Sequence, residues 1–545
     1  MKLFKFKLFV ILWIHTSLVI NAQIDTAWAR SYEAGAWDES MAIATDLEGN
    51  IYVTGSSYVW NTSCDILTMK YNSNGEIQWS KIFSNTSNGW EEGQFINYHK
   101  GFIYVAGYTS QGISTALGSF IVIKYSLQGD TIWTYIENEV QEGAPTAMHF
   151  DSEDNIILAG YDGSSAPSAF ITFKLDSLGN LLWLKKYSNG GGSDVNKIWD
   201  MCLDDSNNIY VTGISDDSFQ TYFDIVTIKY AANGDSLWLK RFNGPSNYYD
   251  SGRSIRYHDD GFIYVGGSSS TDGAAPWDDF VILKYDTSGN LIWNKFYNSV
   301  YNSYDDFRSL EIDHSGNVFA MGVVSKSNNV ETNLIQLVKY NSNGDTIWTS
   351  HLDLPRTDHG NAMLIDSSSN IYITGFTYNN LGQGYNGLTL KIDSSGVLKW
   401  FAEYNGIINN EDQFYSLALD NNNDLIVTGR TKNDSTIMDF NTVKYRNSIL
   451  GIPLIESGNP SLFLNCFPNP SKDITNINFY IPKTATTKLC LFNNKGVEMM
   501  IIGQGIMHSG NHSFVLNTKN LNSGIYYCVL EHENSRIQSK IIILN

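Results

Sequence analysis

A tryptophan returns at intervals of 50 to 55 residues along most of the chain, and this repeat constrains the fold more than any other feature. Two further markers keep the same phase: a glycine within one strand-like segment and a lysine within the next. The tryptophans are Trp28, Trp79, Trp133, Trp183, Trp238, Trp293, Trp348 and Trp400. The glycines are Gly55, Gly107, Gly160, Gly213, Gly266, Gly322, Gly375 and Gly429. The lysines are Lys70, Lys124, Lys174, Lys229, Lys284, Lys339, Lys391 and Lys444.

Each repeat reads as four short strands separated by turns, as in residues 38–83. The strands are rich in Ile, Val, Tyr and Thr and carry apolar residues on both faces. Such strands must be covered on both sides, as they are when four-stranded blades stack around an axis, whereas a solenoid would need one short strand per coil. The sequence therefore predicts an all-β fold, with an eight-bladed β-propeller over residues 23–456.

The two ends of the repeat complement each other. Residues 25–32 form a tryptophan strand that precedes any complete unit, and the last unit stops at Tyr445 without one. We expect the first strand to complete the last blade, which closes the ring non-covalently and removes an open edge.

The repeat units resemble the bacterial β-propeller repeat known as SBBP, in stretches such as residues 208–213 and 250–255. This resemblance implies a propeller, and because that family is named for seven blades, seven is the alternative count. Residues 286–293 also resemble the docking motif of quinoprotein propellers, in which the tryptophan packs between blades.

The first 22 residues have the features of a secretory signal peptide: Lys2, Lys5 and Lys7, an apolar run over residues 8–20, and cleavage after Ala22. The apolar run is shorter than the roughly 20 residues of a membrane helix, and no later stretch approaches that length, so we expect no transmembrane segment. The formal net charge of −20 makes nucleic acid and anionic membranes poor partners.

The repeated lysine permits two interpretations: a ligand-binding ring, or a residue that lies between blades and pairs with an acid. Its presence in every blade favours the second. The expected partners end the first strand of each unit, at Asp46, His99, Asp151, Asp204, His258, Asp313, Asp366 and Asp420.

A second acidic series, which precedes that strand, would form a ring around the channel mouth. Such a ring would hold Ca²⁺ or cap loop amides, and capping requires no ion. We therefore expect no cofactor and no metal, with Ca²⁺ as the weaker alternative. The series comprises Asp38, Glu91, Asp250, Asp305, Asp358 and Asp412.

Four tryptophans outside the repeat phase fall in segments of variable length that we expect to be loops on one face. With two neighbouring acids they are the candidate ligand-binding residues, because exposed aromatic side chains on a rigid scaffold stack on sugar rings or anchor protein partners. The alternative is that each tryptophan only covers the end of its own blade. The candidates are Trp37, Asp38, Trp60, Trp90, Glu91 and Trp277.

Catalytic and metal-site signatures do not occur in the sequence. It contains no Gly-x-Ser-x-Gly elbow, His-Glu-x-x-His motif or P-loop, so we assign no catalytic residue. The five cysteines lack metal-site spacing and are interpreted as mostly buried thiols, with a Cys490–Cys528 disulfide left open.

After a linker at residues 457–462, residues 463–545 form a different module, expected to be a small immunoglobulin-like β-sandwich. Its motif resembles the type A C-terminal sorting domain of the type IX secretion system. That resemblance implies passage through the type IX machinery, removal of the domain, and in many cargo proteins attachment to lipopolysaccharide. The motif residues are Pro468, Asn469, Pro470, Gly496, Gly510, Gly524, Tyr526 and Lys540.

These features predict a secreted or cell-surface protein of a Gram-negative bacterium. The leading hypothesis is a non-catalytic binding or adhesion module for an extracellular glycan or protein. The alternatives are a polysaccharide hydrolase or lyase and a structural element of a surface layer.

Overall fold

The computed structural model describes residues 24–447 and 463–543, apart from residues 34–36, 59–63, 86–88, 111–117, 141, 164–167, 190–194, 217–221, 272–277, 302, 327–332, 353–356, 379–383, 407–410, 434–437, 468–470, 472, 509 and 534. Every regular element in these residues is a β-strand. None of the described segments is a helix long and apolar enough to cross a membrane. The predicted signal peptide lies outside the described residues.

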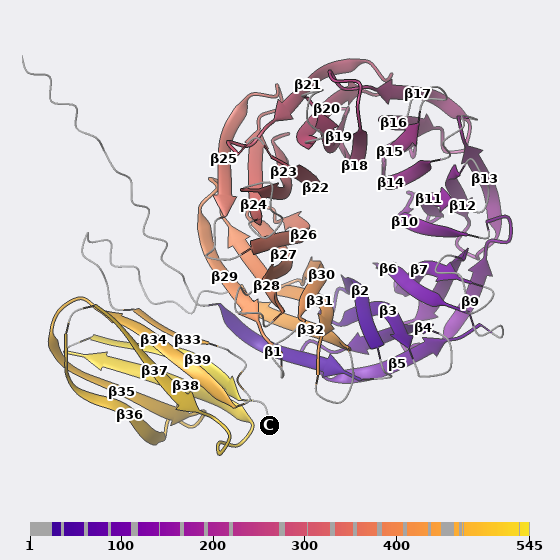
Figure 1. The fold of residues 1–545 in the computed structure, drawn as a ribbon. Helices are drawn as coiled ribbons and strands as arrows, with labels where there is room; N and C mark the ends of the chain where they lie inside the picture. Colours follow the sequence, from indigo (N-terminus) through magenta and orange to yellow (C-terminus); the bar gives the residue numbers. More distant parts are fainter. Residues whose placement is uncertain are drawn as a thin grey trace, which may run out of the picture.

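Eight four-stranded antiparallel sheets form a ring (Figure 1). This confirms the all-β propeller and the count of eight blades. The first strand of each sheet lies nearest the axis of the ring. These inner strands are β2 (Trp37–Thr45), β6 (Glu91–His99), β10 (Gly143–Phe150), β14 (Asn196–Leu203), β18 (Asp250–His258), β22 (Asp305–Ile312), β26 (Thr357–Ile365) and β30 (Gln413–Leu419).

The two middle strands of each blade are almost continuously buried, because neighbouring blades cover both of their faces. The second strands are β3 (Ile51–Tyr58), β7 (Phe102–Thr109), β11 (Ile156–Asp162), β15 (Ile209–Asp216), β19 (Phe262–Ser270), β23 (Val318–Ser325), β27 (Ile371–Tyr378) and β31 (Leu425–Thr431). The third strands are β4 (Cys64–Tyr71), β8 (Ser119–Ser126), β12 (Ala169–Leu175), β16 (Phe223–Tyr230), β20 (Asp278–Asp286), β24 (Asn333–Tyr340), β28 (Tyr385–Ile392) and β32 (Asp439–Arg446).

The outer strand of seven blades follows directly in sequence, and the eighth blade takes its outer strand from the start of the chain. Strand β1 (Asp25–Tyr32) pairs antiparallel with β32, from Asp25 opposite Arg446 to Tyr32 opposite Phe440. The other outer strands are β5 (Ile77–Phe83), β9 (Thr131–Ile136), β13 (Leu181–Tyr187), β17 (Ser236–Phe242), β21 (Leu291–Tyr297), β25 (Thr346–Leu352) and β29 (Leu398–Tyr404).

Each inner strand contains one β-bulge, at the same place in every blade. The register with the second strand skips a single residue there, and a bulge of this kind redirects the side chain of the extra residue. The eight bulge residues are Met41, Gln94, Thr146, Trp199, Arg253, Arg308, Asn361 and Tyr415.

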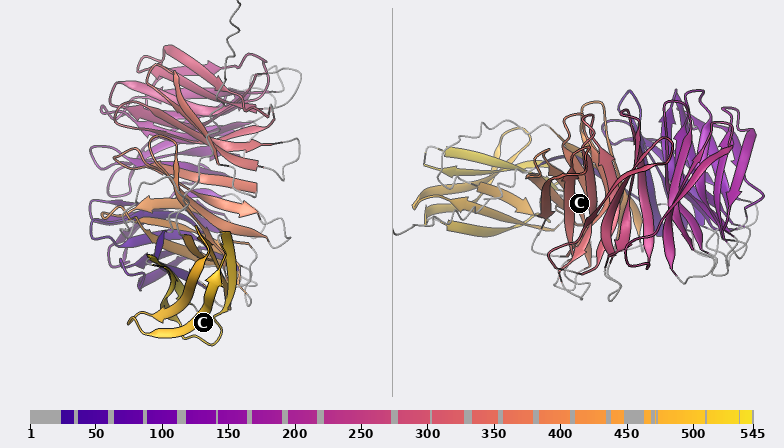
Figure 2. Two further views of the ribbon diagram at one scale, coloured as in Figure 1. Left: turned by 90° about the vertical axis from the view of Figure 1, so that its left-hand side faces the viewer. Right: turned by 90° about the horizontal axis from the view of Figure 1, so that it is seen from above.

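The C-terminal module is a β-sandwich, as predicted, and it lies beside β1 (Figures 1 and 2). One sheet contains β33 (Phe463–Phe467), β34 (Ile474–Ile481) and β37 (Gly510–Asn517). The other contains β35 (Ala485–Asn493), β36 (Glu498–Met507), β38 (Gly524–His532) and β39 (Ser535–Ile543). Side chains of both sheets share one buried core.

All five cysteines are buried free thiols, so the disulfide between Cys490 and Cys528 is not formed. In the pairing of β35 with β38, Cys528 lies opposite Leu491 and Cys490 lies opposite Val529. Because side chains alternate between the faces of a sheet, the two sulfur atoms point to opposite sides.

Candidate functional site

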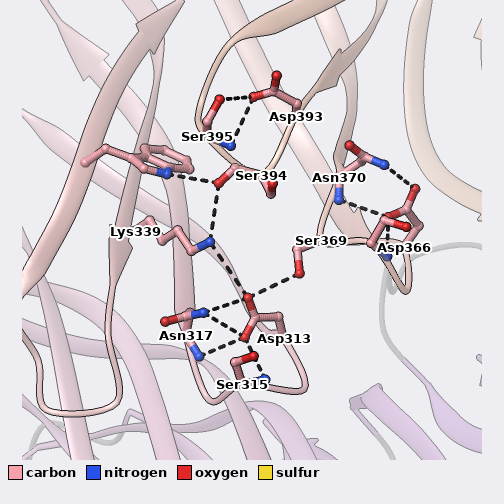
Figure 3. Close-up of polar contacts among 12 residues, drawn as sticks. Asp313, Ser315, Asn317, Lys339, Asp366, Ser369, Asn370, Asp393, Ser394 and Ser395 are labelled. Carbon is pink, nitrogen blue, oxygen red and sulfur yellow. Dashed lines mark hydrogen bonds and ion pairs between the residues drawn. The ribbon is translucent and has the colours of Figure 1, made fainter.

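The repeated lysine and tryptophan both bind the tight turn of the next blade. Lys339 Nζ and Trp348 Nε1 donate to the carbonyl oxygen of Ser394, at 3.3 and 3.2 Å (Figure 3). Gly396 in that turn has a φ of +86°, and a Cβ there would lie 3.0 Å from the Trp348 ring. Six blades make this double contact, on Leu127, Ser177, Ala232, Thr287, Ser342 and Ser394.

Four of the repeated lysines form ion pairs within their own blades with the acids that the sequence predicts. The Lys174–Asp151 and Lys444–Asp420 pairs measure 2.6 Å, and longer pairs reach Asp204 and Asp313. In the blade that carries His258, the lysine pairs with Asp260 instead, at 3.7 Å. These buried contacts assign the lysine series to blade packing.

Asp313 shows how this acidic series caps its turn. Its carboxylate accepts hydrogen bonds from the backbone amides of Ser315 and Asn317 at 3.0 and 2.9 Å, from the Asn317 side chain, and from the Ser369 hydroxyl of the next blade (Figure 3). Burial alone would raise the pKa of Asp313, but the Asn317 hydrogen bonds and Lys339 lower it. Protein donors therefore occupy this carboxylate. The adjoining pocket, about 430 Å³, lies between the Asp313 and Asp366 turns.

The second acidic series is buried at the opposite end of the inner strands. Asp305 and Asp412 each accept a hydrogen bond from a backbone amide six residues earlier, at 2.7 and 2.8 Å. Burial raises the pKa of both, and that of Glu91, to about 7. These contacts are the loop capping that the sequence favours over a calcium ring; Ca²⁺ itself stays an untested prediction.

Two of the predicted ligand-binding tryptophans come together through a tyrosine. Trp37 and Trp90 are 37% and 39% exposed, and each lies at a seam between blades, beside Met438 and Cys64 respectively. Tyr58 is the cross-strand partner of Trp37, and its ring stacks on Trp90 at 6.2 Å. We call Trp37, Tyr58 and Trp90 the aromatic surface.

Charged groups surround the aromatic surface. The Arg430 guanidinium lies over the Trp37 ring at 5.7 Å and binds Glu39 at 3.2 Å. Glu92 accepts a hydrogen bond from Tyr108, and burial together with the nearby Glu39 raises its pKa. The region thus combines apolar ring faces with carboxylate acceptors.

The remaining predicted site residues are placed differently. Asp38 and Glu91 are fully buried, so they support the loops beneath the aromatic surface. Trp60 and Trp277 lie outside the described residues. Trp37 begins β2 and Trp90 immediately precedes β6, so both lie at strand ends where the sequence predicts loops.

Sequence reasoning missed Tyr58, Arg430 and Trp199. Tyr58 and Arg430 reach the aromatic surface from β3 and β31, through contacts between strands and blades that the repeat pattern does not record. Trp199 could have been found from the sequence, because beyond the predicted signal peptide five tryptophans lie outside the repeat phase and Trp199 is the one not assigned to a variable loop.

The described residues of the sorting motif serve the turns and core of the sandwich. Gly496 and Gly510 have positive φ values of 75° and 129°, and Gly524 has a φ of 156°. Tyr526 is buried and donates to the carbonyl oxygen of Asn522 at 3.0 Å. Lys540 donates to the carbonyl oxygen of Thr26 in β1, also at 3.0 Å. Pro468, Asn469 and Pro470 lie outside the described residues.

Comparison with known proteins identifies the C-terminal module. Residues 465–544 match the family described as the secretion system C-terminal sorting domain. The chain therefore carries a sorting domain of type IX secretion, which marks a secreted or cell-surface protein handled by that machinery.

Three distant relatives are similar to this chain over most of the propeller, each at low sequence identity. An uncharacterized WD repeat-containing protein of Acanthamoeba polyphaga mimivirus is 22% identical over 467 residues, 62% of this chain and 33% of the relative. PorZ, an essential surface component of the type IX secretion system of Porphyromonas gingivalis, is 11% identical with a TM-score of 0.37, over 93% of this chain and 70% of that one. The polysaccharide lyase Uly1 is 13% identical with a TM-score of 0.40, over 78% and 100%. The chain thus spans about a third of the length of the viral relative.

Proposed function

We propose that this secreted or cell-surface propeller is a non-catalytic binding module that takes an extracellular glycan or protein on its aromatic surface. The observation that supports this most directly is the exposure of Trp37 and Trp90 with Tyr58 between them. Large aromatic side chains that remain exposed on a rigid scaffold are typical of binding sites, where they supply contact area at low entropic cost.

The chemistry around these rings favours a ligand that combines flat apolar faces with hydrogen-bond donors. Sugar rings have both, since their C–H faces stack on indole and their hydroxyl groups donate to carboxylates such as Glu39 and Glu92. A protein partner with a basic, aromatic-rich patch would use the same groups. Export through the type IX machinery, followed by attachment to lipopolysaccharide, would present this surface outside the cell.

The test is a glycan and protein binding screen with the full mature chain, followed by Trp37→Ala, Trp90→Ala and the double variant. We expect the double variant to lose at least tenfold in affinity while its melting temperature stays within a few degrees of the parent, because residues at the centre of an interface carry most of the binding energy. Leu182→Ala is the matched control: it removes another exposed apolar side chain, in β13, which is 51% exposed.

Two results would contradict the proposal. Unchanged affinity with a lowered melting temperature would show that the tryptophans only cover their blades. Release of soluble sugars from a polysaccharide in a parallel activity assay would instead support a hydrolase or lyase.

A further inference from the structure

The bulge residues differ from blade to blade, unlike the tryptophan and lysine markers that every blade shares. Three consecutive blades place Trp199, Arg253 and Arg308 at this position. Lys197 precedes Trp199 by two residues on the same inner strand, β14. The inner strands β14, β18 and β22, which lie nearest the axis of the ring (Figure 1), therefore carry three cations and an indole ring.

The Arg253 side chain contacts an aromatic ring, and its positive charge also acts on Asp278, whose pKa it lowers against the larger effect of burial. Its guanidinium lies 4.5 Å from the centre of the Trp199 ring, and among the described residues it forms no ion pair and no hydrogen bond. Arg253 Nε and Trp199 Nε1 are both buried donors without a partner there. Buried donors in native proteins are nearly always bonded to protein or water, so these two donors are available to an acceptor from outside the described residues.

Lys197 repeats this arrangement one blade earlier. Its ammonium group lies 4.6 Å from the centre of the Tyr161 ring, and it too has no ion pair within the described part of the chain. The chain has 56 acidic residues against 36 basic ones, so acids are plentiful. Other cations on the same inner strands do form ion pairs with acids: Arg256 binds Asp200 at 2.6 Å, and Arg308 binds Asp306 at 2.6 Å.

Two exposed tyrosines precede the inner strands that carry Arg253 and Arg308. Tyr249 immediately precedes β18 and is 40% exposed, and it contacts Tyr222 and Tyr248 at ring distances of 5.0 and 4.9 Å. Tyr304 precedes β22 and is 44% exposed. Arg253 and Arg308 thus follow these tyrosines by four residues in the chain, so aromatic faces on which a sugar can stack lie at the start of both inner strands.

We propose that Arg253 and Trp199 bind the carboxylate or sulfate group of a short acidic saccharide, with Lys197, two residues before Trp199 on β14, as an additional cation. A guanidinium group matches either oxyanion with two parallel N–H bonds, and the indole N–H supplies a third donor. The net negative charge of the protein disfavours long polyanions, but at physiological salt it is screened within about 8 Å, so a short ligand is governed by the local cations. This site is separate from the aromatic surface, which belongs to the first and second blades.

The full mature chain is titrated by calorimetry with trigalacturonate, which carries carboxylates, and with a κ-carrageenan tetrasaccharide, which carries sulfates. Fully methyl-esterified trigalacturonate has the same sugar rings without charge. We expect at least one acidic probe to bind, the ester to bind at least tenfold more weakly, and higher salt to weaken binding. The probe that binds identifies the oxyanion.

The variants separate this site from general effects. Arg253→Gln is expected to weaken binding at least tenfold, Arg253→Lys to weaken it less, and Lys240→Gln in β17, a matched charge loss, to leave it unchanged. The Trp37→Ala/Trp90→Ala variant should bind the acidic probe as tightly as the parent does, whether or not the aromatic surface binds a ligand of its own. Absence of binding by both acidic probes, equal binding of the ester, or full binding by a folded Arg253→Gln variant would each overturn the proposal.

Discussion

Asp412 and Asp366 belong to neighbouring blades but lie at opposite ends of the inner strands, and their carboxyl groups respond to folding in opposite ways. Burial raises the pKa of Asp412 to about 7, so folding favours its neutral form, and its contribution to stability is lost as pH rises from about 4 to about 7. Burial alone would raise the pKa of Asp366, but the hydrogen bonds from Asn370 lower it. The contribution of Asp366 to stability is therefore lost only as pH falls below about 4. Between pH 5 and 8 the melting temperature of Asp412→Asn should therefore fall less steeply than that of the parent. The melting temperature of Asp366→Asn should be lower than that of the parent by the same amount throughout this range. Parallel curves for Asp412→Asn and the parent, measured by scanning fluorimetry, would contradict this.

At the scale of the element, β1 decides whether the eighth blade is complete. Trp28 in this strand is 6% exposed, donates to the carbonyl oxygen of Ser73 at 3.1 Å, and covers the Gly75 turn of the first blade. Deleting residues 25–32 exposes the edge of β32 and removes this packing, so we expect a loss of several kcal/mol of unfolding free energy. Denaturant unfolding measures the loss, and a synthetic peptide of residues 25–32 should restore part of it. A deletion variant as stable as the parent would show that the ring does not depend on this strand.

For the whole molecule, the sorting domain predicts where the chain goes. Residues 459–545 fused behind a signal peptide and a fluorescent reporter should carry the reporter to the surface or the medium of a bacterium with type IX secretion, and the same fusion should stay in the periplasm of a strain without that system. Cell fractionation distinguishes these outcomes. Retention in the periplasm of the secreting strain would exclude residues 459–545 as a sufficient signal.

Repetition explains how much of this could be predicted. The contact of Trp348 with the Gly396 turn recurs around the ring, so the tryptophan and glycine that make it recur in the sequence. The number of blades and the packing between them could be predicted from this repeat. The stacking of Tyr58 on Trp90 and of Arg253 on Trp199 occurs once each, between blades. Such contacts depend on the bulge and on the spacing of neighbouring sheets, which the sequence pattern does not contain.

Because β1 pairs with β32, the eighth blade combines strands that are synthesised at different times. Synthesis begins at the N-terminus, so β1 is the first strand of the propeller to be made and β32 is the last. Throughout the interval between them, β1 has no partner, and the growing array of blades has an open edge at each end. A chain that ends before residue 439 lacks β32, so its β1 stays unpaired and the array of blades keeps both open edges. Closure of the ring thus requires that the whole propeller has been made.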